Sequence, residues 1–287
     1  MELRGIAVAY EVFGEGEETV LLLPPWAIIH SRFWKAQVPY LARHFRVVTF
    51  DPRGNGRSDR PPRPAEYAVP VEAEHTLMLL DEVNVERCVM IAHCGAAPLA
   101  LLLAADHPER FAGAVFMSPA LPLTPPLPER TGFDFDADLA EYEGWGKANR
   151  HHWQRDFRDY LEFFFSRCFT EAHSTKQVED CVAWGLEGSP ETLVATIEAP
   201  DLERDEVYEL LGRLDIPLLV TQGDQDGLIP PDRGAAFAGL TGARLIELKD
   251  AGHCPHARHP VKFNLLIREF AERCFGTLPS PSAGSAR

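Results

Sequence analysis

Three side chains that can carry out acyl chemistry lie far apart in the sequence, and each follows a predicted strand. Cys94 follows an apolar run at residues 88–92, Asp226 follows the run at residues 218–221, and His253 comes after residues 243–248. A cysteine thiolate can attack an acyl carbon, a histidine can move protons to and from it, and a carboxylate can orient the histidine. These residue types predict nucleophilic catalysis through an acyl-cysteine intermediate.

The surroundings of Cys94 predict a sharp turn between a buried strand and a helix. An alanine- and leucine-rich helix is expected over residues 99–105, so Cys94 lies at the apex, near a helix N-terminus that favours negative charge. The tight turn requires small neighbours, and Ala92 and Ala96 occupy the two flanking positions. This is a nucleophile-elbow pattern with alanine in place of both glycines and cysteine in place of serine. A buried structural cysteine is the alternative, and a serine-to-cysteine replacement would give the same pattern.

The acid and histidine segments contain further candidates. Asp226 comes three residues after Gly223, and Asp224 is a second candidate whose position favours capping of the turn. His93 and Cys254, which adjoin the nucleophile and the histidine, are interpreted as structural. The predicted triad is therefore Cys94, His253 and Asp226.

Five segments in this order resemble the α/β-hydrolase superfamily over nearly the whole chain. They are Leu21-Leu22-Leu23-Pro24-Pro25-Trp26, Asp51-Pro52-Arg53-Gly54-Asn55-Gly56-Arg57-Ser58-Asp59, the segment around Cys94, Gly223-Asp224-Gln225-Asp226, and Gly252-His253-Cys254-Pro255. The resemblance implies a mostly parallel eight-stranded sheet flanked by helices, with an inserted helical lid. It also implies an oxyanion hole formed by the backbone N–H groups of Trp26 and Gly95. Pro24-Pro25 stands where the family commonly has His-Gly, but the Trp26 donor is retained.

A change of composition after Ser118 marks the predicted insertion. Residues 119–128 contain five prolines, and residues 131–205 carry 17 acidic against 7 basic residues. The sequence therefore predicts an α/β core at residues 1–118 and 206–276, a lid at 119–205 and a disordered tail at 277–287. Four residues are expected to line the substrate pocket: Trp26, His30, Trp145 and Trp153.

Local signals predict several helices around the site. Residues 31–45 are expected to be helical, with Pro39 in conflict with that pattern, and residues 139–169 are expected to form an aromatic-rich helix. Ser174 begins a capping-box sequence, and Ser189 is predicted to cap another helix that has Pro190 in its first turn.

Composition limits the remaining function classes. The chain has 287 residues and a net charge of −15, which argues against nucleic acid and anionic membranes as partners. No apolar run reaches the length of a membrane span, and no signal-peptide pattern begins the sequence, so a cytoplasmic location is expected. The six cysteines form no close pair, and neither a disulfide framework, a metal site nor a cofactor is expected. A homodimer is left open.

The sequence thus predicts a lidded enzyme that hydrolyses a small acyl compound: an ester, thioester or lactone. An acyltransferase or cyclising enzyme with the same triad is one alternative. A ligand-binding relative that has lost its chemistry is the other.

Overall fold

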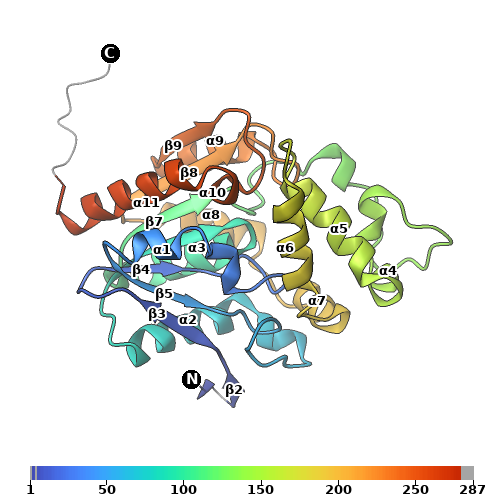
Figure 1. Cartoon of the computed structure of the whole chain (residues 1–287), viewed down its shortest axis with the longest axis horizontal. Coiled ribbons are helices and arrows are strands. Elements are labelled where there is room, and N and C mark those ends of the chain that lie inside the picture. The colour runs from blue at the N-terminus through green and yellow to red at the C-terminus, as the bar shows by residue number, and fades with distance from the viewer. Residues whose placement is uncertain (1, 4, 279–287) are drawn as a thin grey trace.

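A seven-stranded sheet forms the centre of the protein (Figure 1). The computed structural model describes residues 2–3 and 5–278. The strands run in the order β3-β5-β4-β6-β7-β8-β9, and only β3 pairs antiparallel with its neighbour. Their bounds are β3 (Tyr10–Phe13), β4 (Thr19–Leu22), β5 (Arg46–Phe50), β6 (Cys88–His93), β7 (Phe111–Met117), β8 (Leu218–Gly223) and β9 (Arg244–Leu248).

The expectation of eight strands in this sheet is wrong. The N-terminal residues form a separate antiparallel pair, β1 (Glu2–Leu3) and β2 (Ile6–Ala7). The Ala7 N–H donates to Asp59 Oδ2 at 2.7 Å, which joins β2 to the turn after β5. The positive φ of Gly5, 78°, allows the sharp turn between β1 and β2.

Both faces of the sheet are covered, and this explains the continuous apolar runs of its central strands. Strands β4, β6 and β7 are buried along their whole length. One face packs against α11 (Pro260–Phe275), through Phe263 and Ile267, and the other packs against α2 (Val69–Glu82), α3 (Ala97–Asp106), α8 (Arg204–Gly212) and α9 (Asp232–Thr241). Each face of the sheet has its own hydrophobic cluster. Neighbouring residues of a strand point to opposite faces and therefore belong to different clusters, as Leu21 and Leu22 do.

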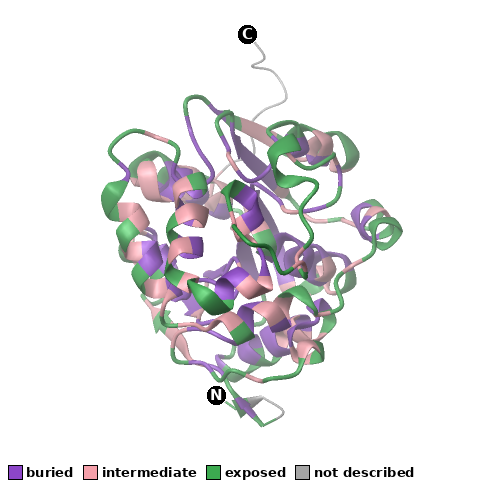
Figure 2. Cartoon of the chain, turned by 90° about the vertical axis from the view of Figure 1, so that its right-hand side faces the viewer, coloured by how far each residue is buried: buried purple, intermediate pink, exposed green. Residues whose placement is uncertain are grey.

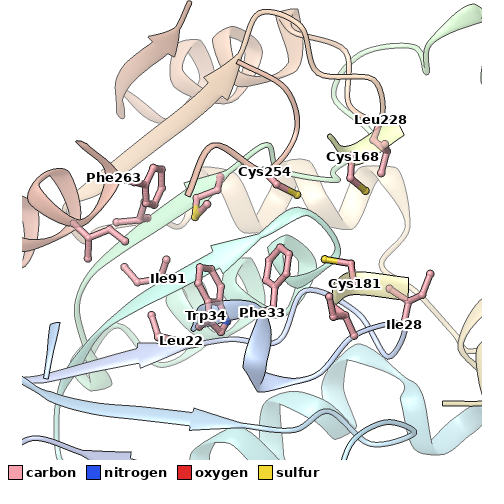
Figure 3. Packing of buried hydrophobic residues seen from close by; sticks show 14 of the residues in the cluster. Leu22, Ile28, Phe33, Trp34, Ile91, Cys168, Cys181, Leu228, Cys254 and Phe263 are labelled. Atoms are coloured by element: carbon pink, nitrogen blue, oxygen red, sulfur yellow. The ribbon is translucent and has the colours of Figure 1, made fainter. Parts of the chain in front are cut away.

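A segment of helices lies between β7 and α8. It contains α4 (Arg150–Arg155), α5 (Phe157–Cys168), α6 (Thr175–Gly185) and α7 (Pro190–Ile197), at the right of Figure 1. We refer to residues 119–203 as the helical segment. Figure 2 views the molecule from this side and shows buried residues interspersed with intermediate and exposed ones along the helices. Figure 3 shows Cys168 and Cys181 of this segment near Cys254 and Leu228 of the core, in one continuous apolar cluster.

Capping side chains decide where several of these helices begin. The predicted helix at 139–169 starts only at Arg150, because Asn149 accepts hydrogen bonds from the N–H groups of His151 and His152 at 2.8 and 3.3 Å. It is divided again at Asp156, whose carboxylate accepts from the Asp159 N–H at 3.0 Å. The predicted Ser189 cap is confirmed, since its hydroxyl accepts from the Thr192 N–H at 3.2 Å.

Two other helix predictions need correction. Ser174 precedes α6 but forms no capping hydrogen bond; its hydroxyl donates to the Glu171 carbonyl instead. The predicted helix at residues 31–45 is divided into a 3₁₀ turn, Ser31–Trp34, and α1 (Val38–Leu41). This division places Pro39 in the first turn of α1, where its missing N–H costs no helical hydrogen bond.

Two predicted boundaries, the end of the insertion at residue 205 and the start of the tail at residue 277, can be compared with the structure. The predicted boundary at residue 205 falls inside α8, which begins at Arg204. Most of the predicted tail, residues 279–287, lies outside the described residues. Within the described part of the chain, no helix is long and apolar enough to cross a membrane.

Candidate active site

The chain turns sharply at Cys94, between β6 and α3. Cys94 has a φ of 50°, in the left-handed region that residues with a Cβ rarely adopt. Ala92 and Ala96 on either side are buried, so larger side chains would not fit there. Backbone strain of this kind is concentrated at functional sites, and here it places the Cys94 side chain at the end of the strand.

The predicted acid and histidine lie together at the ends of neighbouring strands. Nδ1–H of His253 donates to the Asp226 carboxylate, at 2.9 Å from Oδ2 and 3.0 Å from Oδ1. Asp226 Oδ1 also accepts from the N–H groups of Leu228 and Ile229, at 2.9 and 3.0 Å. The side chains of Asp226 and His253 are both buried, so the imidazole is held in one orientation.

Cys94 lies close enough to His253 to influence the charge of its ring. Burial alone would lower the pKa of His253, but the Asp226 carboxylate and Cys94 outweigh it and hold that pKa well above its usual value. Burial likewise acts to raise the pKa of Asp226, but the attraction and hydrogen bond of His253 leave it below its usual value. The site therefore favours an imidazolium between two partners that can carry negative charge.

The neighbouring candidates take supporting positions. Asp224 does not contact His253; its carboxylate accepts from the Ala251 N–H at 3.3 Å and holds the turn before the histidine. His93 donates from Nε2 to the His253 carbonyl at 2.9 Å, and Cys254 is buried.

The segment after β4 lies directly against the elbow. A Cβ added to Gly95 would come within 2.5 Å of the Pro25 carbonyl oxygen, so glycine is required for this close approach. Trp26 follows, and its indole N–H donates to Thr196 Oγ1 at 2.9 Å. The two backbone groups expected to form an oxyanion hole thus belong to adjacent segments.

A cavity of about 360 Å³ opens beside Cys94, at the lower end of the range for small-molecule sites. Trp26 and Gly95 line it. The core and the helical segment both contribute apolar walls, which include Ala96, Leu99, Phe164, Ile197, Leu228 and Ile229.

Three predicted pocket residues do not line this cavity. His30 is buried and accepts from the Arg32 N–H at 3.4 Å, so it caps a 3₁₀ turn. Trp145 and Trp153 are buried within the helical segment, where Trp145 packs edge-on to Phe163 and Trp153 lies 4.7 Å from the ring of Tyr160. These two tryptophans stabilise the segment rather than face the cavity.

Sequence reasoning missed a group of polar residues at another part of the cavity wall. Arg53 lies in the turn after β5, and Glu72, His75 and Thr76 share one face of α2. Their i, i+3, i+4 spacing marks a common helix face, which was a usable signal. Within the described ranges, no group of three His, Cys, Asp or Glu side chains is placed to hold a metal ion.

A parallel sheet with a strand–elbow–helix, followed by an acid and a histidine on later strand ends, defines the α/β-hydrolase class. The chain belongs to the alpha/beta hydrolase fold family, whose model matches residues 18–260. It is similar to 3-oxoadipate enol-lactonase 2 of Acinetobacter baylyi, with 22% identity over 94% of this chain and 95% of that protein. The relatives are hydrolases, and the protein is a hydrolase-family enzyme.

Solved structures show the same fold. An N-acyl homoserine lactone degrading enzyme, Est816, superposes with a TM-score of 0.76 at 24% identity, covering 94% of this chain and 98% of that one. The enol-lactonase from Burkholderia xenovorans superposes with a TM-score of 0.75 at 22% identity, covering 93% and 97%.

Proposed function

We propose that the protein hydrolyses a small ester, thioester or lactone through an acyl-cysteine formed on Cys94. The observation that carries this proposal is the arrangement of Cys94 beside His253, which is hydrogen-bonded to Asp226, at the wall of a largely apolar cavity. Lactones are included because the chain is similar to an enol-lactonase and to a lactone-degrading enzyme.

In the first half of the reaction, the Cys94 sulfur attacks the acyl carbon as a thiolate, with its proton on His253. The carbonyl electron pair moves to oxygen, where the N–H groups of Trp26 and Gly95 stabilise the oxyanion. The tetrahedral intermediate collapses, the bond to the leaving oxygen or sulfur breaks, and the imidazolium of His253 protonates it. A thioester on Cys94 remains.

In the second half, His253 removes a proton from water as the water oxygen attacks the thioester. Collapse of this intermediate breaks the carbon–sulfur bond, and a carboxylic acid leaves while the sulfur returns to the thiolate–imidazolium pair. Asp226 stays ionised throughout, and it orients the ring and stabilises the imidazolium.

We also propose that the helical segment acts as a lid. Phe164 and Thr196 of this segment contact Trp26 on the core side, and Phe164 and Ile197 line the cavity. Such a cover limits the access of water and strengthens the electrostatic interactions within the site.

Steady-state hydrolysis of p-nitrophenyl acyl esters tests this function. Wild type is expected to release both p-nitrophenol and free acid, whereas Cys94→Ala is expected to release neither above background. Cys94→Ser is expected to retain part of the activity, because serine can use the same base and oxyanion hole. Normal turnover by Cys94→Ala would refute the mechanism, and transfer of the acyl group to an added amine without free acid would identify a transferase.

A further inference from the structure

The cavity beside Cys94 has two chemically different parts. Near the sulfur its walls are apolar, with Trp26, Phe164 and Leu228 among them. Along α2 and the turn after β5 it is lined by the ionisable side chains Arg53 and Glu72 together with apolar ones such as Val69 and Leu79, and Arg130 of the helical segment also lines the cavity. A substrate that fills this cavity would present its acyl group to one part and a second functional group to the other.

Arg53 is unusual among these side chains, because it is a buried cation with few partners. It is only 4% exposed, and its two terminal nitrogens, Nη1 and Nη2, form no hydrogen bond within the described chain. Burial lowers the pKa of this guanidinium while Glu72 and Glu66 oppose that shift, and it remains strongly basic. A buried, charged donor without acceptors costs free energy unless a partner binds it during function.

The nearest acid holds Arg53 only weakly. Glu72 Oε1 lies 3.9 Å from Nη2, too far for a hydrogen bond. A third of the Glu72 side chain remains accessible where it lines the cavity. Burial raises the pKa of Glu72 to about 7 against the attraction of Arg53, and the nearby Asp201 adds to that rise. Glu72 therefore forms no hydrogen bond that fixes it beside Arg53.

We propose that Arg53 binds a carboxylate group carried by the substrate. The Glu72 side chain occupies the position beside the Arg53 guanidinium until the substrate arrives. The substrate class would then be acyl compounds with a second, ionised carboxyl group, such as half-esters of dicarboxylic acids or carboxylated lactones. This inference rests on the proposed function only for the reacting group; carboxylate binding itself requires no catalysis.

Geometry and charge favour a carboxylate over the other ionic groups. The planar guanidinium fork matches the two oxygens of a carboxylate and forms paired hydrogen bonds with them. The bound carboxylate would take the two free donors of Arg53 and release Glu72 toward the open part of the cavity. A cationic substrate group would instead require Glu72 and Asp201 as its partners, and it would leave the buried donors of Arg53 unsatisfied.

The test compares p-nitrophenyl esters that differ only at the far end of the acyl chain. One series ends in a carboxylate, a second in a methyl group and a third in a trimethylammonium group. We expect kcat/KM to be highest for the carboxylate series. Arg53→Met should reduce the preference for carboxylate over methyl by about 10- to 100-fold, which corresponds to the loss of a charged hydrogen-bonded pair.

Three further variants make the result specific. Arg53→Lys keeps the charge but not the fork, so it should retain part of the preference. Glu72→Gln removes the competing charge and should strengthen the preference for the carboxylate series. Arg63→Met is the matched control, because Arg63 is exposed, pairs with Glu66 and does not line the cavity; it should leave the preference unchanged. Thermal unfolding of Arg53→Met and Arg53→Lys shows whether each remains folded.

A binding measurement separates this inference from the proposed function. Calorimetry of Cys94→Ala with adipic acid monomethyl ester should show binding that the added Arg53→Met change weakens by a similar factor. If the esters are not hydrolysed but this binding difference is present, the proposed function fails and the carboxylate site stands. Equal kcat/KM for the carboxylate and methyl series, or a preference for trimethylammonium, would overturn the carboxylate site while leaving the hydrolase intact.

Discussion

A sulfur atom and an imidazole carry the chemistry proposed for this protein, and their environment is set by a few neighbours. Cys94 adopts a strained backbone conformation and contacts His253, which is held in turn by both oxygens of Asp226. The other cysteines have a different environment. Burial raises the pKa of Cys88 to about 12 and that of Cys274 to about 11. Cys94 differs from Cys88 and Cys274 because a basic side chain, His253, lies beside it.

The first prediction concerns the charge of His253. Asp226→Asn removes the attraction and the hydrogen bond that raise the pKa of His253, while burial continues to lower it. The pKa should fall, so the ring loses its proton at a lower pH than in wild type. Nitrogen NMR of the ring over a pH series measures this shift, and kcat/KM should fall by about 10²- to 10⁴-fold. An unchanged titration would show that Asp226 does not set the ionisation of His253.

The second prediction concerns the contact between two elements, the elbow and the segment after β4. Gly95→Ala places a methyl group where the Pro25 carbonyl lies, so that segment must move away and displace the Trp26 N–H. We expect kcat/KM for esters to fall by about 10²-fold or more, as on loss of an oxyanion donor. Alkylation of Cys94 by iodoacetamide, which needs no oxyanion hole, should persist.

Two other outcomes of the Gly95→Ala experiment would contradict this arrangement. Unchanged ester hydrolysis in Gly95→Ala would show that the close approach to Pro25 has no catalytic role. Loss of both hydrolysis and alkylation would indicate that the elbow itself had been distorted.

The third prediction tests how the helical segment is joined to the core. Thr196→Val removes the acceptor of the Trp26 indole N–H. The free energy of unfolding should fall by about 1 kcal/mol. Because Trp26 lines the cavity, kcat/KM should also shift in favour of longer acyl chains.

Thr241→Val is the matched control for this change. Thr241 lies at the end of α9, and its hydroxyl donates to the Phe237 carbonyl much as that of Thr196 donates to Leu193. It does not line the cavity, so it should lower stability without altering the chain-length preference. Equal chain-length profiles for the two variants would show that the contact of Trp26 with the helical segment does not affect the choice of substrate.

At the element scale, the sequence was informative for the central strands and the elbow. Burial on both faces makes β6 and β7 continuous apolar runs, and small residues make the elbow visible around Cys94. The face that a helix turns toward a cavity depends on tertiary packing, which a local sequence pattern does not show. The sequence alone placed Trp145 and Trp153 in the pocket, but tertiary packing turns both into the interior of the helical segment.

The whole molecule carries a strong negative charge, −15, and residues 131–205 contribute −10 of it. A field of this sign repels anions as they approach, although the buried Arg53 attracts them within the cavity. Approach and binding of a carboxylate substrate should therefore respond differently to salt.

The fourth prediction follows from this contrast. Raising the ionic strength from about 0.01 M to about 0.15 M shortens the screening length from about 30 Å to about 8 Å. For esters that end in a carboxylate, kcat/KM should rise, because long-range repulsion weakens while the buried Arg53 contact is less screened. Methyl-terminated esters provide the control and should show little change. A fall in kcat/KM for the carboxylate series would show that attraction, not repulsion, governs its approach.

At the scale of the molecule, the sequence predicted the class of fold, because chain order and strand-end motifs survive without knowledge of packing. It also placed Cys94, Asp226 and His253 after strands, and the structure joins the last two by a hydrogen bond. The sequence predicted a pocket with Trp26 in its wall, but it did not predict the wall formed by α2. Arg53 lies in a turn that serves as a structural motif, and only the arrangement of α2 against that turn brings Glu72 within 3.9 Å of it. The separate N-terminal pair of strands depends on a turn at Gly5.

Intact-mass spectrometry of the protein, quenched within the first turnover of a p-nitrophenyl ester, tests the proposed chemistry most directly. We expect a mass increase equal to one acyl group, located on Cys94 by peptide mapping, absent in Cys94→Ala and strongly reduced in His253→Ala. Hydrolysis at the wild-type rate with the acyl group on another residue, or an adduct that forms equally well without Cys94, would contradict it.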